Sequence, residues 1–260
     1  MKRIRTMKDE FYIGYMDKPP RGVMGTVKKA VFGALAFFLI SGLVFVLAPN
    51  KSDNATFELG EVTKLRGVLY AKPYPTLLVE FPDGASKDVL LLGYGKFGAQ
   101  RILDVIKGEE GQVDGFEVSV SGNLIYYDGK TLFQLLMDEP DFFKKSVRSQ
   151  TIRKREIYGE VRLEGEIIDP KCYFGVMKPG YGKIHRSCAT RCLSGGIPPV
   201  LMVTSSTGEK EYYLIKKDNP GEFGESFLDF IAKPVEIRGN LERVGDWLVI
   251  KTNITKLKSL

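Results

Sequence analysis

The sequence predicts a mostly β protein: one N-terminal transmembrane helix, followed by two tandem β-barrels, the second with an inserted loop. Three observations predict this organisation. An uncharged apolar run covers residues 30–48, and four sequence blocks after it recur in the same order. All three cysteines and the single histidine of the 260-residue chain lie between Cys172 and Cys192. The first observation gives the anchor, the second the repeated unit, and the third the candidate site.

The apolar run 30–48 is about as long as the hydrocarbon core of a bilayer requires. The tail 1–29 carries many basic residues, so the positive-inside rule keeps it in the cytoplasm. A cleaved signal peptide is the competing interpretation, but no A-x-A cleavage site follows the run. We therefore expect a single-pass protein of a bacterial inner membrane, with a cytoplasmic N-terminus and periplasmic C-terminal domains.

Two further segments bear on partners. The tail is aromatic at 11–20, which predicts docking on a membrane protein complex or contact with the lipid headgroups. The net charge of +6 comes partly from a basic stretch at 144–155. Outside a membrane, such a stretch favours a solvated linker, anionic lipid or an acidic partner. Integral membrane proteins and lipids are thus the expected partners, and nucleic acid is not.

The repeat indicates two copies of one small domain. Each copy reads strand, strand, strand, short helix, strand, strand, with β-branched residues in alternation between Gly, Pro and Asp. This order predicts an OB-fold-like barrel. The matching blocks are 60–69 and 159–167, 74–79 and 198–203, 96–107 and 222–233, and 118–124 and 235–241. The predicted domains are a first barrel at 56–138, a basic linker at 139–157 and a second barrel at 158–258.

The two copies differ most between their first and second strands. The first copy uses only residues 71–75 there, whereas the second inserts residues 169–197, which hold every cysteine and histidine. OB-folds often use this loop for ligand contact. Because the first copy lacks the insertion, the Cys/His motif is not required merely to form a barrel.

The Cys/His spacing is C-x12-H-x2-C-x3-C. A helix would place His185, Cys188 and Cys192 on one face, with Gly195 and Gly196 ending it. With Cys172 from the preceding segment they form a Cys3His set, which suits tetrahedral zinc. The same donors also suit copper(I) or an iron–sulfur cluster. Zinc is the favoured metal, although the spacing matches none of the standard zinc-finger patterns.

Other uses of these thiols stay open. In an oxidising compartment two cysteines could form a disulfide that staples the loop. A nucleophilic cysteine with His185 as base is a third possibility, but the chain shows no third orienting residue and no C-x-x-C motif. The run Gly93-Tyr94-Gly95-Lys96-Phe97-Gly98 imitates a dinucleotide-binding loop, yet it lacks a βαβ context and is expected to be a turn. No catalytic residue is predicted.

The second barrel resembles a group of small exported bacterial OB-fold domains. They share the runs GEIIDPKC, HxxCxxxC and GGIPP, found here at 165–172, 185–192 and 195–199. The resemblance covers about the last hundred residues and implies a fold and an exported location, but no reaction. The expected function is a periplasmic accessory subunit that binds a metal or redox cofactor, in a membrane redox or metal-handling complex. The alternative is an interaction module with a disulfide-stapled loop.

Overall fold

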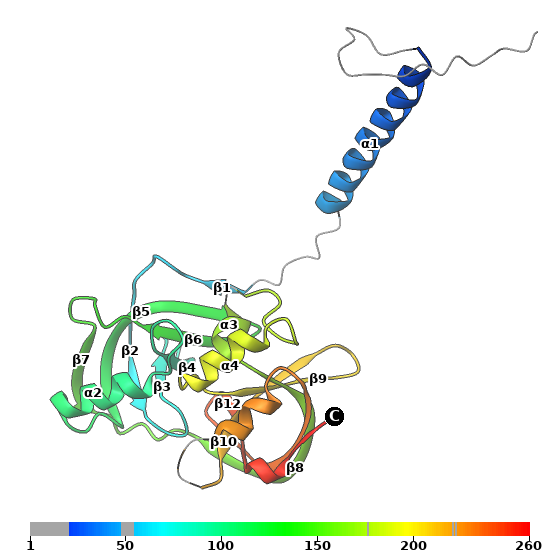
Figure 1. The fold of residues 1–260 in the computed structure, drawn as a ribbon. Helices are drawn as coiled ribbons and strands as arrows, with labels where there is room; N and C mark the ends of the chain where they lie inside the picture. The colour runs from blue at the N-terminus through cyan, green and yellow to red at the C-terminus, as the bar shows by residue number, and fades with distance from the viewer. Residues whose placement is uncertain (1–20, 48–54, 176, 220, 222) are drawn as a thin grey trace, which may run out of the picture. The chain divides into compact units, whose positions relative to one another are not determined.

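The computed structural model describes residues 21–47, 55–175, 177–219, 221 and 223–260. The chain divides into two compact units, Met1–Asp53 and Asn54–Leu260. The first contains helix α1 (Arg21–Leu47), and the second contains all the strands (Figure 1). Most of the tail 1–29, including its aromatic part 11–20, lies outside the described residues.

Helix α1 carries its basic residues, Arg21, Lys28 and Lys29, in its first third and is uncharged after them, and its segment Val23–Leu47 is long and apolar enough to cross a membrane. None of that stretch is buried within the protein, which leaves side chains such as Phe38 and Phe45 exposed. At 1.5 Å per residue, a helix of this length spans the hydrocarbon core of a bilayer. A signal sequence near the N-terminus can meet the same criteria of length and hydropathy.

The first barrel is a closed sheet of five strands. Strands β2 (Thr63–Tyr70), β3 (Thr76–Glu80) and β4 (Ser86–Leu92) are antiparallel neighbours. Helix α2 (Gln100–Glu110) leads to β5 (Phe116–Tyr127), which forms a hairpin with β6 (Lys130–Leu135). Pairing of β5 with β2, and parallel pairing of β4 with β6, close the barrel. Short strand β1 (Thr56–Phe57) adds to β5.

The second barrel repeats this topology strand for strand. Strands β8 (Arg155–Ile168), β9 (Val200–Thr204) and β10 (Lys210–Lys217) precede the 3-10 helix η1 (Glu225–Phe230). Strand β11 (Pro234–Val244) pairs with β8 and with β12 (Trp247–Thr252), and parallel pairing of β10 with β12 closes the sheet. The 3-10 helix η2 (Ile254–Lys256) and strand β13 (Leu257–Ser259) complete the chain. The predicted mostly β fold with two tandem OB-fold-like barrels is confirmed.

The segment 139–157 between the barrels is partly built into them. Strand β7 (Phe143–Arg148) pairs with β5 of the first barrel, and β8 already begins at Arg155. Arg153, between these strands, is buried and forms an ion pair of 2.8 Å with buried Asp88. At least one basic residue of this segment, Arg153, is therefore part of the folded structure and not only of a solvated linker.

The two barrels pack against each other through a shared apolar cluster. It combines first-barrel side chains such as Leu90 and Leu132 with second-barrel side chains such as Phe174 and Trp247. Trp247 is fully buried, and its indole N–H donates to the Asp88 carbonyl at 3.1 Å. Each barrel also keeps its own core. Removing this much apolar surface from water stabilises the pair as one body.

Candidate metal centre

The inserted connection between β8 and β9 begins with a one-turn helix, α3 (Pro170–Phe174). Asp169 caps it: its carboxylate accepts from the backbone N–H of Lys171 at 2.9 Å and of Cys172 at 3.4 Å. Pro170 suits the first helical position because no hydrogen bond is needed from its nitrogen. The cap fixes the turn that carries Cys172.

Helix α4 (Arg186–Ser194) supplies the other candidate ligands, as the spacing predicts. His185 occupies the position before the helix, and Cys188 and Cys192 lie one turn apart along it. The helix ends at Gly195, whose N–H donates to carbonyl groups of the last turn. Gly196 follows with φ of 91°, a conformation that favours glycine.

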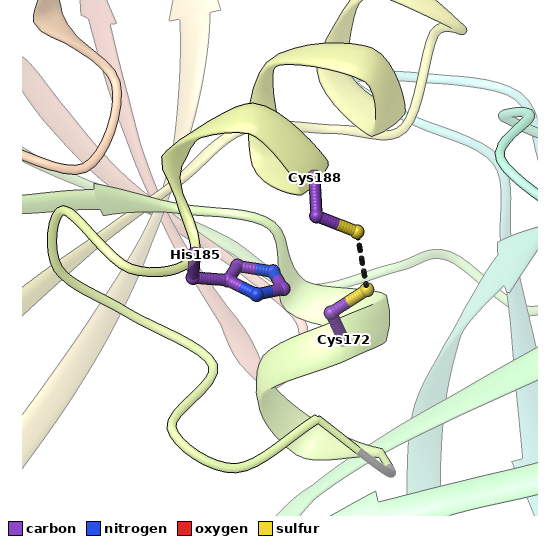
Figure 2. Close-up of side chains that lie close together, drawn as sticks. All are labelled: Cys172, His185 and Cys188. Atoms are coloured by element: carbon purple, nitrogen blue, oxygen red, sulfur yellow. Dashed lines mark hydrogen bonds between the residues drawn. The ribbon is translucent and has the colours of Figure 1, made fainter.

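Cys172, His185 and Cys188 converge on one point (Figure 2). Their ligand atoms all lie within 4.8 Å of one another, and the sulfurs of Cys172 and Cys188 are 3.9 Å apart. Two thiolates on a tetrahedral zinc ion, each about 2.3 Å from it, are separated by roughly 3.8 Å. A disulfide requires about 2.05 Å. All three cysteines are free thiols, and this pair has the separation of metal ligands.

His185 is suited to donate a neutral nitrogen. Its side chain is only 3% exposed, and its buried Nε2 atom has no hydrogen-bond partner. Burial lowers the pKa of His185, against an opposing effect of Asp169, and nearby Lys96 acts in the same direction as burial. A buried nitrogen without a partner is costly, whereas a metal ion would use its lone pair.

Cys192 belongs to a second group that the sequence did not predict. It lies with Asp169 and Cys172, and the ligand atoms of these three residues are also within 4.8 Å of one another. The pKa of Cys172 is raised. A hydrogen bond with the Cys192 thiol makes the largest contribution, and burial makes the next largest. The four predicted ligands thus form one Cys/His cluster that could hold a metal ion, arranged as two triads that share Cys172.

The first barrel forms one wall of this cluster through its turn between β4 and α2, residues 93–98. The ammonium group of Lys96 lies 3.4 Å from the Cys188 sulfur. From the second barrel, buried Lys171 donates to the carbonyls of Gly93 at 2.8 Å and Gly95 at 2.6 Å in the first. Burial lowers the pKa of Lys171 to about 8. The glycine-rich run is a turn, as expected, and it packs against the Cys/His cluster.

The two glycine-rich segments meet backbone to backbone. The Gly98 N–H donates to the Gly195 carbonyl at 3.1 Å. A Cβ atom on Gly98 would lie 1.9 Å from the Gly196 oxygen, and one on Gly195 would lie 1.9 Å from the Lys96 oxygen. Only glycine permits this approach. The contact sets the distance between Lys96 and the cysteines.

Comparison with known proteins adds no further assignment: the chain matches no family model, and no curated protein is significantly similar to it. The site therefore rests on its own geometry. Sequence reasoning predicted the four Cys/His residues that the structure brings together, but it missed Asp169, Lys96 and Lys171. The signal for Asp169 was its place in the DPKC run, where an N-cap position puts a carboxylate beside the cysteine.

Proposed function

We propose that this chain is a membrane-anchored accessory subunit whose second barrel holds a thiophilic metal ion, zinc in preference to copper or iron. The ion serves a membrane redox or metal-handling complex. The observation that carries the proposal is the arrangement of Cys172, His185 and Cys188: free thiols 3.9 Å apart beside a buried imidazole nitrogen that has no partner.

The donor set supports zinc. Thiolate and imidazole are the usual protein ligands of zinc. Cys172, His185 and Cys188 would fill three of the four tetrahedral positions and leave the fourth for another donor. Zinc bound there would have no redox role and would fix the inserted loop. Copper or iron in the same place would make the chain a carrier or an electron relay.

The proposed location follows from α1 and from the resemblance to exported domains. The helix is long enough for a single span, and the basic tail 1–29 favours a cytoplasmic N-terminus. Both barrels then lie in the periplasm of a bacterial inner membrane. A fusion reporter at the C-terminus, active only in the periplasm, tests this orientation.

Elemental analysis of the full chain, purified anaerobically in detergent, tests metal binding. We expect at least one equivalent of metal per chain, and H185Q and C188S should each lose the equivalent that these two residues bind. S187A changes an exposed residue between these two ligands and should keep the metal. Metal-free wild-type protein that takes up no zinc on titration would refute the proposal.

A second candidate function is an interaction module, favoured by an apolar pocket beside the metal cluster. The pocket has a volume of about 360 Å³ and is lined by four residues of the turn (Gly93, Tyr94, Phe97 and Gly98), by Arg101 and Ile102 of α2, and by Met137 and Asp138. Tyr94 and Met137 are 68% and 45% exposed and belong to this lining. A native disulfide with a single free thiol in the purified protein would favour this function.

A further inference from the structure

We propose that the cluster is a two-ion site in which the Cys172 thiolate bridges two thiophilic divalent metal ions. Cys188 and His185 complete the ligands of one ion, and Cys192 and Asp169 those of the other. This inference rests on the proposed function, since it adds a second ion to the same cluster.

Geometry gives the first argument. The donor atoms form two compact triads, each with all members within 4.8 Å of one another, and Cys172 is common to both. Cys192 groups with Asp169 rather than with His185 and Cys188. Each triad has the size of a three-ligand metal site, so the shared sulfur lies between two positions for an ion.

Asp169 gives the second argument. Its side chain is 0% exposed, and only one carboxylate oxygen, Oδ1, is used to cap α3. The other oxygen, Oδ2, is buried without a hydrogen-bond partner. A buried carboxylate oxygen without a hydrogen-bond partner lowers the stability of the fold, and carboxylate oxygens are known zinc ligands.

The nearest ammonium group does not pair with this oxygen. Lys171 donates instead to the carbonyls of Gly93 and Gly95, and among the described residues no ion pair joins it to Asp169. Lys96 is exposed and faces Cys188 in the other triad. The Asp169 triad therefore lacks a protein cation in direct contact with its carboxylate.

Charge gives the third argument. Three thiolates and one carboxylate carry four negative charges when they bind metal, and a neutral His185 adds none. Two divalent ions match all four of these charges, whereas a single divalent ion would leave two of them to be offset by Lys96 and Lys171. Buried charges persist in proteins when they are paired or bind metals.

Anaerobic titration of the metal-free full chain with cobalt(II) in detergent tests the proposal through the visible absorption of cobalt–thiolate bonds. Wild-type protein should take up two equivalents. D169N keeps an oxygen that can cap α3, and C192A keeps a small apolar side chain in a buried position; each should bind one equivalent. H185Q should also bind one, whereas C172S should bind none tightly.

The outcomes separate the two proposals. One equivalent in wild-type protein, retained with unchanged affinity in D169N and C192A, would overturn the two-ion site and leave the proposed function standing. One equivalent that is lost in both D169N and H185Q would mean a single ion bound by all donors, which also overturns it. No cobalt in wild-type protein would overturn both. S187A is the matched control and should bind as wild type.

Discussion

The ammonium group of Lys96 on the first barrel lies 3.4 Å from the sulfur of Cys188 on the second. The ammonium group donates a hydrogen bond to this sulfur. Because Lys96 is exposed, the contact contributes little: exposed charged contacts are worth about 0.2–1 kcal/mol, roughly a one- to fivefold change in an equilibrium or a rate.

Loss of this hydrogen bond in K96M should therefore change the alkylation rate of Cys188 in metal-free protein by up to about fivefold. Mass spectrometry of iodoacetamide-treated protein locates and quantifies the modified cysteine. K96R keeps the charge and should react as wild type. K107M, in the last turn of α2, controls for a general loss of positive charge. Equal rates in K96M and K96R would argue against the contact.

The backbone contact between the turn 93–98 and the end of α4 should tolerate no side chain. We expect G98A to lower the free energy of unfolding by about 2 kcal/mol or more, because its Cβ atom would clash with the Gly196 oxygen. G108A is the control: it lies within α2 with nothing within 4 Å of its Cβ position. Alanine there should raise stability by up to about 1 kcal/mol. Denaturant titration measures both.

The buried ion pair between Asp88 and Arg153 should hold the barrels together. D88N leaves a guanidinium group buried without its charged partner, which typically costs about 3–5 kcal/mol. The exposed pair Arg66–Glu117 has a similar separation of 2.8 Å, but E117Q should cost less than about 1 kcal/mol. Equal losses in the two variants, measured by denaturant unfolding, would mean that Asp88 is not part of a stabilising joint.

The carboxylate of Glu236, on β11, should make stability depend on pH. Burial alone would raise its pKa, but Arg238 at 2.9 Å and Arg162 at 2.6 Å together lower it below 4.5. A lowered pKa in the folded state gives stability at neutral pH that is lost as the pH falls through that pKa.

E236Q should therefore be less stable than wild type at pH 7, and the difference should shrink as the pH falls below about 4.5. Thermal unfolding over this pH range measures it. E160Q removes an exposed carboxylate from the same sheet and should show no such trend. A constant difference between E236Q and wild type at every pH would contradict this account.

Much of the fold could be predicted because the sequence pattern of one barrel occurs twice in the chain. The repeated blocks supplied strand order and helix position, and the two-residue turns such as Asp128–Gly129 marked the closing hairpins. The location of the Cys/His insertion followed from comparing the copies. The domain boundaries, the orientation in a membrane and the resemblance to exported domains stay predictions.

The rest depends on contacts between segments that are distant in the sequence. The grouping of Cys192 with Asp169 depends on how α3 and α4 pack, and helical spacing alone places Cys192 with His185 and Cys188. Lys96 reaches the cluster from the other barrel, and the packing of the barrels has no periodic signal in the sequence. Strand β7 was hidden in a basic stretch, because charged residues fall on both of its faces and obscure the alternation of a strand.

The glycine contact between the barrels limits how this protein can be divided. The second barrel contributes every proposed ligand, yet one side of its Cys/His cluster is closed by the turn 93–98 of the first. One barrel thus carries the donors while the other covers them. The second barrel therefore depends on the first for the protection of its thiols. Grafting the second barrel alone onto another protein would leave these thiols open to solvent and to oxidants.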